Sequence, residues 1–417
     1  MKNKIIITIV VIMLCLIGST LCFIVYGNKL RGTKPAQTKQ VVFNDKDYNV
    51  RLFKTTYATS EGNYLISPYS IYVALSMVRD GGNNNTRDEI SNIIGTDNAK
   101  LLDNKAVHIA NAMFLKDQYK DAITPTFTEG LSNNYKAQLL MDKFETPAVI
   151  NNWVDKETSG MIKKVMDDID KDFVLGLANA IAIDVKWQNQ FICSATRSEE
   201  FTQKNGNKLN VEMMHQSYEF GADYIEYDNA KGIIIPYEDE TNLEYIAIRP
   251  NNDLDEYINN FSLDELSKME ENSKKASDSL HINLSLPRYT YEFELKSFMK
   301  NLQSMGMKDA FNKDTADFTN IITRDNMKKY EIANLYINQA IHKSYIELTE
   351  SGTKAAAVTF FGFAKATAVQ PKYTTVDINF DKSFMYIIRD KNTKDILFIG
   401  VVDKPNEWKG STCPEEE

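Results

Sequence analysis

Side chains that could perform nucleophilic or metal chemistry are few in this chain and lie far apart. The histidines are His108, His215, His281 and His342, and the cysteines are Cys15, Cys22, Cys193 and Cys413. Their spacing forms no zinc motif, nucleophile elbow or phosphate-binding loop. We therefore expect neither catalysis nor a bound metal or cofactor. An isolated cysteine is more often an inert apolar residue than a nucleophile, so we expect the domain to depend on its core and not on disulfides.

The segment that could act through its backbone is SYIELTESGTKAAAVTFFGFAKAT, residues 344–367. Its first part is predicted to be a strand ending at Glu350, and Gly352 permits a hinge. Side chains of a strand alternate between its faces. One face of residues 353–359 carries Thr353, Ala355, Ala357 and Thr359, and the other carries Lys354, Ala356 and Val358. The first face is small and uncharged, so this stretch could fit between strands that already cover a core.

The same stretch could also be an exposed helix, because alanine and lysine are good helix formers. The β-branched pair Val358 and Thr359, followed by aromatic residues, favours extended structure instead. No proline interrupts residues 353–364, so a central strand could form its full ladder of hydrogen bonds there. The inward face would also carry Phe361 and Phe363, which are bulky.

Residues 45–405 contain no repeat, linker or low-complexity break, which predicts one domain of about 360 residues. Helical patterns dominate its first third: Ser67 caps a helix that begins at Pro68, and Thr86-Arg87-Asp88-Glu89 resembles a capping box. Strands are predicted at residues 232–236, 243–248, 281–286, 376–380 and 396–402, with a helix at 293–302. This order indicates an α+β fold with large mixed sheets.

The N-terminus carries an uncharged run of 22 residues, Ile5 to Tyr26, after Lys2 and Lys4. A bilayer span needs roughly 20 residues and a signal-peptide core about 7–15. We favour a signal-anchor over a cleaved signal peptide for residues 1–26, with residues 27–44 as a tether and 406–417 as a tail. Both interpretations place the domain at the outer face of a cell membrane or in the medium.

The acidic balance of the chain limits its partners. Its 417 residues carry a net charge of −9, and an acidic surface repels phosphate backbones. We therefore do not expect the chain to bind nucleic acid. We expect the protein to be a monomer.

Seven motifs, in order along about 360 residues, resemble those of the serpin family. They are residues 63–90, residues 150–160, Asn179-Ala180 with Trp187 and Phe191, Val211 to Met214, Leu286-Pro287-Arg288, His342 to Ala357, and Leu397 to Gly400 with Pro405. Ile183-Asp184-Val185 and Ser383-Phe384 depart from the family's usual residues, which affects local packing and not the fold.

This resemblance implies the serpin fold: about eight to nine helices, three β-sheets and an exposed reactive-centre loop. It also implies three groups of site residues. The hinge would be Gly352, Thr353, Lys354, Ala355, Ala356, Ala357, Val358 and Thr359; the shutter Ser67, Ser70, Asn179 and His342; and the breach Arg288, Glu350 and Trp187. We expect the breach ion pair to be partly exposed, contributing about 0–1 kcal/mol and tuning the hinge as a gate.

The implied function is suicide inhibition of serine proteases. A protease would cleave the loop and be acylated by it, and the hinge would then insert as an extra strand and distort the protease. Counting forward from Gly352 places the reactive bond at Ala366–Thr367, which suits an elastase- or subtilisin-like enzyme. Lys365 is an alternative that suits a trypsin-like enzyme, and Lys372 is a third choice.

Other functions of the same fold remain open at this point. The loop could act on cysteine proteases, or the chain could be a non-inhibitory serpin that serves as a binding or structural module. Non-inhibitory members often carry charged or proline residues on the inserting face, and this hinge does not.

Overall fold

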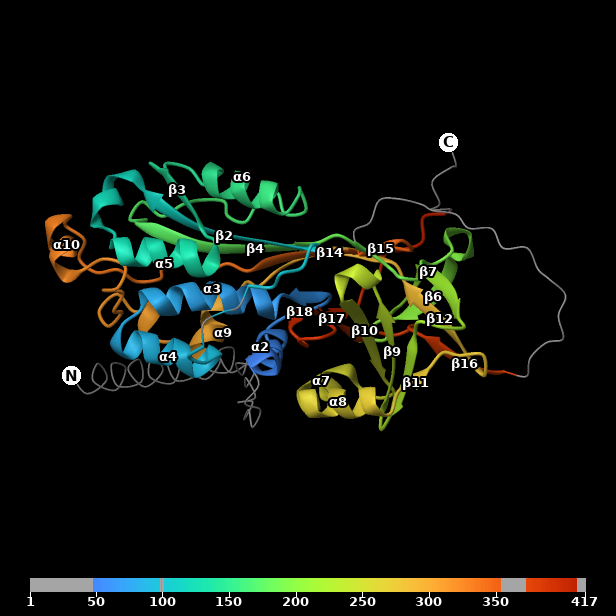
Figure 1. The fold of residues 1–417 in the computed structure, drawn as a ribbon. Coiled ribbons are helices and arrows are strands. Elements are labelled where there is room, and N and C mark those ends of the chain that lie inside the picture. The colour runs from blue at the N-terminus through green and yellow to red at the C-terminus, as the bar shows by residue number, and fades with distance from the viewer. Residues whose placement is uncertain (1–47, 98, 100, 354–372, 411–417) are drawn as a thin grey trace, which may run out of the picture. The chain divides into compact units, whose positions relative to one another are not determined.

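The computed structural model describes residues 48–97, 99, 101–353 and 373–410, which all belong to one compact unit, Asp45–Glu417. The predicted segments 1–26 and 27–44 lie outside the described residues, as does most of the tail. The described part of the chain is an α+β fold, as predicted, with helices and sheets in separate layers (Figure 1).

The described residues form nine α-helices, and the first long one begins as its sequence predicts. The helices are α2 (Tyr48–Tyr57), α3 (Pro68–Gly81), α4 (Asn84–Ile94), α5 (Pro125–Tyr135), α6 (Ala148–Glu157), α7 (Leu254–Asn260), α8 (Leu263–Glu271), α9 (Phe298–Ser304) and α10 (Arg324–Lys329). Ser67 Oγ accepts a hydrogen bond from Ser70 N–H at 3.1 Å, and Pro68 occupies the first helical position.

Two helix boundaries differ from the prediction. The expected capping box at Thr86 is wrong, because α4 begins at Asn84 and is capped by Asn83. Thr86 Oγ1 instead accepts a hydrogen bond from the Asp317 N–H at 2.9 Å, a long-range contact that no local pattern indicates. The predicted helix at 293–302 begins only at Phe298, since residues 293 and 294 end a strand.

Two sheets contain the five predicted strands, which the structure confirms. One has the order β1 (Tyr64–Ile66), β18 (Ile396–Val402), β17 (Phe384–Asp390), β10 (Leu243–Pro250), β9 (Ala230–Pro236), β8 (Asp223–Tyr227) and β11 (Lys274–Lys275). The other has the order β16 (Thr374–Asn379), β12 (Leu280–Pro287), β7 (Lys208–Tyr218) and β6 (Arg197–Thr202).

The remaining strands belong to one large sheet that is parted along its length. One part is β3 (Gln138–Asp142), β2 (Val107–Lys116) and β4 (Leu175–Ile183). The other is β13 (Tyr289–Glu294), β14 (Lys343–Leu348), β15 (Gly352–Thr353) and β5 (Val185–Lys186). Since β5 continues the chain of β4, the two parts join at that end. Among the described residues the hydrogen-bonded sheets therefore number four and not three.

The parted sheet has a different apolar cluster on each face. Ile181 and Ile183 of β4 face the main core, which includes α3 residues such as Val73 and Leu75. Ala178 and Ala180 face a second cluster beneath α6, on the opposite side of the sheet (Figure 1). The alternation of a strand thus gives every residue of β4 a defined inner or outer face.

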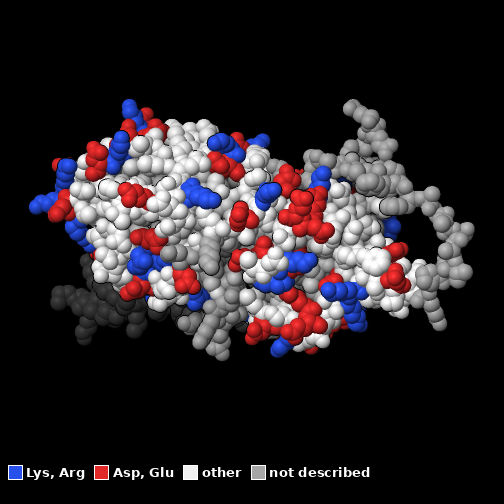
Figure 2. All heavy atoms as spheres, viewed as in Figure 1, with Lys and Arg blue, Asp and Glu red and all other residues white. Residues whose placement is uncertain are grey.

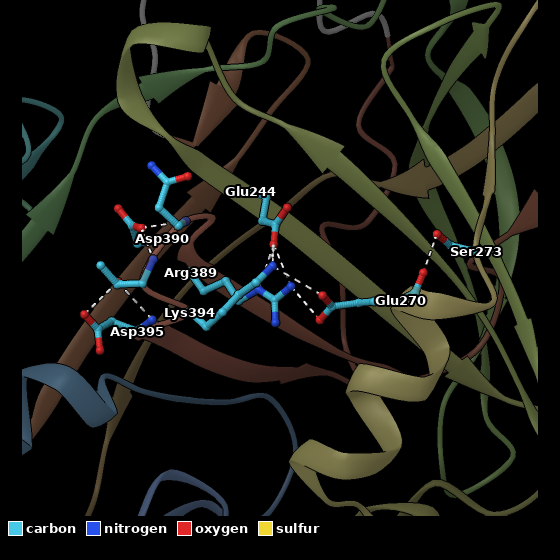
Figure 3. Close-up of polar contacts among 9 residues, drawn as sticks. Glu244, Glu270, Ser273, Arg389, Asp390, Lys394 and Asp395 are labelled. Atoms are coloured by element: carbon cyan, nitrogen blue, oxygen red, sulfur yellow. Dashed lines mark hydrogen bonds and ion pairs between the residues drawn. The ribbon is translucent and has the colours of Figure 1, made fainter.

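An ionic cluster with a buried centre, Arg389 and Glu244, joins α8 to the seven-stranded sheet (Figure 3). Arg389 of β17 lies with Nη2 2.6 Å from Oε1 of Glu244 on β10 and 2.6 Å from Oε1 of Glu270 on α8. Lys394 Nζ approaches the same two carboxylates at 3.5 and 3.3 Å. Removing one member of such a cluster leaves an uncompensated charge, so its charges act as a unit.

The surface shows no segregation of charge on the side drawn in Figure 2, where acidic and basic side chains are interspersed. In the part of the chain that the structure describes, we find no helix long and apolar enough to cross a membrane. The two departures from the family's residues pack well: Ile183 and Val185 are buried, and Ser383 Oγ donates to Asp403 Oδ1 at 2.6 Å.

Candidate functional site

The candidate site is the parting of the large sheet, and its upper end is already closed by the first two hinge residues. Gly352 and Thr353 form β15, which pairs antiparallel with Lys186 and Val185 of β5. Thr353 also pairs with Leu348 of β14. A Cβ atom on Gly352 would lie 2.1 Å from the carbonyl oxygen of Val185, so the close approach of these strands requires glycine.

The side chain of Thr353 points inward and fixes the orientation of the hinge. It is 2% exposed, and its Oγ1 lies 2.6 Å from the hydroxyl oxygen of Tyr237. Tyr237 stacks on Trp187 with ring centroids 4.5 Å apart, and burial raises its pKa well above the ordinary value, so it stays a neutral hydroxyl. Sequence reasoning missed Tyr237, because it comes from a distant connection and carries no local signal.

Below β15 the sheet is open. Among the described residues β4 pairs only with β2, and no strand pairing joins it to β14 or to the chain before it. A cavity of about 270 Å³ lies there, lined on one side by β4 and on the other by residues 335–344. Apolar side chains of α3 and α9, including Leu75 and Leu302, form much of its inner wall. The structure therefore contains an open slot between β4 and the chain that leads into β14.

The four predicted shutter residues lie together beneath this slot. The Nε2 atom of His342 accepts the backbone N–H of Ser67 at 3.2 Å and lies 2.9 Å from Ser344 Oγ. Burial lowers the pKa of His342 from 6.5 to about 4, so the ring is neutral at pH 7. Because Nε2 accepts from Ser67, the proton of the neutral ring belongs on Nδ1.

A second set of hydrogen bonds extends the shutter across β4 to β2. Ser70 Oγ donates to Asn179 Oδ1, and Asn179 Nδ2 donates to Asn111 Oδ1 at 2.7 Å. Asn111 Nδ2 in turn donates to the carbonyl oxygen of Tyr135 at 2.7 Å. Asn111 lies directly opposite Asn179 in the strand register, which is the signal that could have found it had the register been known.

The predicted breach pair is also present. Arg288 Nη2 lies 2.5 and 2.6 Å from the two carboxylate oxygens of Glu350. The Glu350 side chain is buried and that of Arg288 is 14% exposed, so the pair is partly exposed, as expected, and lies mostly out of water. Charges in such surroundings are strongly dependent on their partners, and losing one of them typically costs about 3–5 kcal/mol.

Three further residues complete the breach. Thr196 Oγ1 donates to Glu350 Oε1 at 2.5 Å, and Arg288 Nη1 lies 3.4 Å from Oε2 of the buried Glu212. Trp187 binds the chain on both sides of Glu350: its Nε1 donates to the carbonyl oxygen of Thr349 at 2.9 Å, and its N–H donates to that of Ser351 at 3.0 Å. The breach thus holds residues 349–351 by side-chain and backbone contacts together.

Cys193 lies close by in sequence and corrects the prediction about disulfides. It is disulfide-bonded, and its partner lies outside the described residues. The spacing of four isolated cysteines gave no indication of this bond, since disulfide connectivity depends on the folded chain.

The rest of the predicted site lies outside the described residues. This applies to Lys354, Ala355, Ala356, Ala357, Val358 and Thr359 of the hinge and to the candidate reactive-bond residues Lys365, Ala366 and Thr367. The hinge and reactive-bond assignments for these positions stay predictions.

The described residues form an α+β domain with a parted sheet, and residues from its own continuing chain lie at the head of the parting. The family model described as serpin, serine protease inhibitor, matches residues 44–405. The chain therefore belongs to the serpin family, and its fold is the serpin fold.

Relatives support this assignment over most of the chain. A serpin-like protein of Methanosarcina acetivorans is 30% identical over 84% of this chain and 83% of its own length. The leukocyte elastase inhibitor of Homo sapiens is 29% identical over 82% of this chain and 93% of its own. The crystal structure of tengpin, a thermophilic serpin, in the native state matches with a TM-score of 0.74 and 29% identity, covering 90% of this chain and 95% of that one. The crystal structure of tengpin in the latent state matches this chain with a TM-score of 0.69.

The neutral, buried His342 predicts a pH dependence of stability. The unfolded chain binds a proton at His342 near pH 6.5, whereas the folded chain does so only near pH 4. The contribution of neutral His342 to the free energy of unfolding is therefore fully present above pH 6.5. It falls by roughly 3 kcal/mol as the pH drops to 4. Urea unfolding at pH 7.0, 5.5 and 4.5 should show that His342→Gln removes this part of the slope.

The exposed His108 of β2 supplies the matched control, because His108→Gln makes the same substitution at an exposed position. It should retain the slope of the unsubstituted protein. An identical slope in all three proteins would contradict the assignment of the titration to His342.

Proposed function

We propose that this chain is a suicide-substrate inhibitor of serine proteases that traps the acyl-enzyme by inserting its cleaved loop as an extra strand. The observation that carries the proposal is β15, two hinge residues already paired at the head of an open slot. Residues 354–359 follow β15 directly in the sequence, so insertion would extend β15 into that slot.

Insertion would complete an unfinished ladder. The facing edges of β4 and of the chain leading to β14 each present backbone donors and acceptors that a central strand would pair. About 15 inserted residues at ~3.3 Å each would carry an attached protease roughly 50 Å. Because the protease would be held as an acyl-enzyme, the strand must insert before water hydrolyses the ester.

The shutter and breach are suited to let the sheet open without losing buried hydrogen bonds. The shutter groups come from three elements, α3, β4 and the start of β14, so its serine, asparagine and histidine partners can exchange as strands separate. The breach holds the residues just before the hinge, at the end of the slot where insertion would start.

The expected target is a serine protease with a small primary pocket, since Ala366 precedes the assigned reactive bond. A relative named leukocyte elastase inhibitor supports an elastase- or subtilisin-like enzyme. With Lys365 at the reactive position the target would be trypsin-like. The same loop could acylate a cysteine protease, and the test below separates these outcomes from a non-inhibitory role.

Incubation with an elastase-type protease should give an adduct that survives boiling in SDS, because the acyl bond is covalent. The cleaved protein should unfold at a markedly higher temperature than the intact one, since it has gained a central strand. Cleavage at the loop without an adduct and without this rise in midpoint would identify a plain substrate and overturn the proposal. Mass spectrometry of the released peptide would identify the reactive bond.

Thr353→Arg should convert the inhibitor into a substrate. The Thr353 side chain is buried in β15, and an unpaired arginine there would cost several kcal/mol and disrupt the strand from which insertion would continue. The readout is the number of inhibitor molecules consumed per protease inactivated, which should rise several-fold. The control is Lys354→Arg, which places an arginine on the predicted outer face and should inhibit normally. Unchanged inhibition by Thr353→Arg would contradict the assigned orientation.

We also propose that the domain acts outside the cytoplasm, at the outer face of the membrane or in the medium. The apolar run at residues 5–26 supports export, and the disulfide at Cys193 supports it independently, because such bonds persist in oxidising compartments. N-terminal sequencing of the native protein distinguishes the alternatives. Recovery of a chain that begins at Met1 in the membrane fraction would indicate an anchor. A chain that begins near residue 27 would indicate a cleaved signal peptide. Recovery of the protein from the cytoplasm would contradict export.

A further inference from the structure

We propose that the cavity beneath the slot is the receptacle for the side chains of Phe361 and Phe363, which would lock the inserted strand in place. This inference rests on the proposed function, because it requires the loop to insert as a strand. It assigns a purpose to two bulky residues on a face that is otherwise small.

The orientation follows from Thr353. Its side chain faces the core and contacts Tyr237. Side chains of a strand alternate, so every second residue after Thr353 shares its inner face. Phe361 and Phe363 are the eighth and tenth residues beyond it, so both would face inward in an inserted strand, whereas Phe360 would face outward.

The position along β4 follows from the observed pairing. Thr353 lies opposite Val185, and the pairing is antiparallel, so each step along the loop moves one step back along β4. Phe361 then falls opposite Leu177 and Phe363 opposite Leu175, and both leucines line the cavity.

The other edge of the slot gives the same result. Thr353 lies opposite Leu348 of β14, again antiparallel. Continuing this register places Phe361 opposite Ala340 and Phe363 opposite Asn338, which also line the cavity. The registers at the two edges, both extended from Thr353, thus lead the two aromatic rings to the same cavity.

The whole inner face of the loop matches the slot it would fill. Ala355 and Ala357 would lie opposite the large side chains of Ile183 and Ile181. Thr359 would lie between Asn179 and His342, where its hydroxyl could join the shutter. The two alanines would thus lie opposite large side chains, and Thr359 would lie beside the polar shutter. The two phenylalanines would lie at the cavity, where there is space for their rings.

The size and lining of the cavity suit two rings. A cavity of roughly 150 Å³ lined by apolar side chains holds one benzene-sized ring, and this cavity measures about 270 Å³. Leu302, Phe311 and Phe318 are among the residues of its wall. The next inward residue, Lys365, would fall opposite Tyr336, which is 40% exposed, so its ammonium group can reach water where the apolar receptacle ends.

The test compares Phe361→Ala/Phe363→Ala with the matched control Phe360→Ala, which removes the same side chain from the opposite face. Each protein is cleaved in the loop by an elastase-type protease, and thermal unfolding is followed for intact and cleaved forms. The intact midpoints should agree within about a degree. In the cleaved form the double variant should unfold roughly 5–10 °C below the unsubstituted protein, and the control should not.

The outcomes separate the two proposals. If cleavage fails to raise the midpoint of the unsubstituted protein, the proposed function is wrong. If cleavage raises it equally in all three proteins, insertion occurs but the receptacle is wrong. A loss confined to Phe360→Ala would show that the strand enters with the opposite face inward, and would also overturn this inference.

A reciprocal variant tests the receptacle from its other side. Ala340→Phe places a ring in the cavity before insertion and should lower the midpoint of the cleaved form. Adding Phe361→Ala should recover much of that loss, because the inserted strand then leaves room for the new ring. Additive losses in the combined variant would contradict a shared cavity.

Discussion

The structure depends on one constraint: two strand edges, on β4 and on the chain entering β14, lie side by side in one sheet without pairing over most of their length. Backbone donors and acceptors at such edges need partners, and a sheet that lacks a strand has unused pairing capacity. At its upper end the gap is filled by one strand, since β15 pairs with β14 on one side and with β5 on the other, and apolar clusters pack on both faces of the sheet. The hinge, shutter and breach residues all lie along this gap.

Two kinds of polar contact control the gap, and their physics differs. The shutter is neutral, because burial keeps His342 uncharged and every other member is a hydroxyl or an amide. Neutral groups can change partners at modest cost, which suits strands that must separate. The breach is ionic and buried, with Arg288 held between Glu350 and Glu212. A buried charge tolerates little displacement, which suits a contact that fixes the start of the insertion.

The sequence predicted those features that depend on local pattern, and it missed those that depend on register. The start of α3 at Pro68 and the strand alternation in the hinge depend only on residues that are neighbours in the sequence. The family resemblance added the shutter and breach residues, and the structure brings them together. Tyr237, Asn111 and Glu212 could not be found in this way, because their partners are far away in the chain. The capping box at Thr86 failed for the same reason, since a distant N–H from Asp317 competes for its hydroxyl.

The cavity also bears on why an inserted strand would be favoured. Apolar side chains that line this open cavity lack packing partners, and burying a phenylalanine side chain against such a surface typically contributes about 1.5–3 kcal/mol. Filling it with two phenylalanines would return this free energy only after the loop is cut, when the chain is free to move into the slot. The free energy that drives insertion would thus come from contacts that the intact protein has not yet made between its own residues.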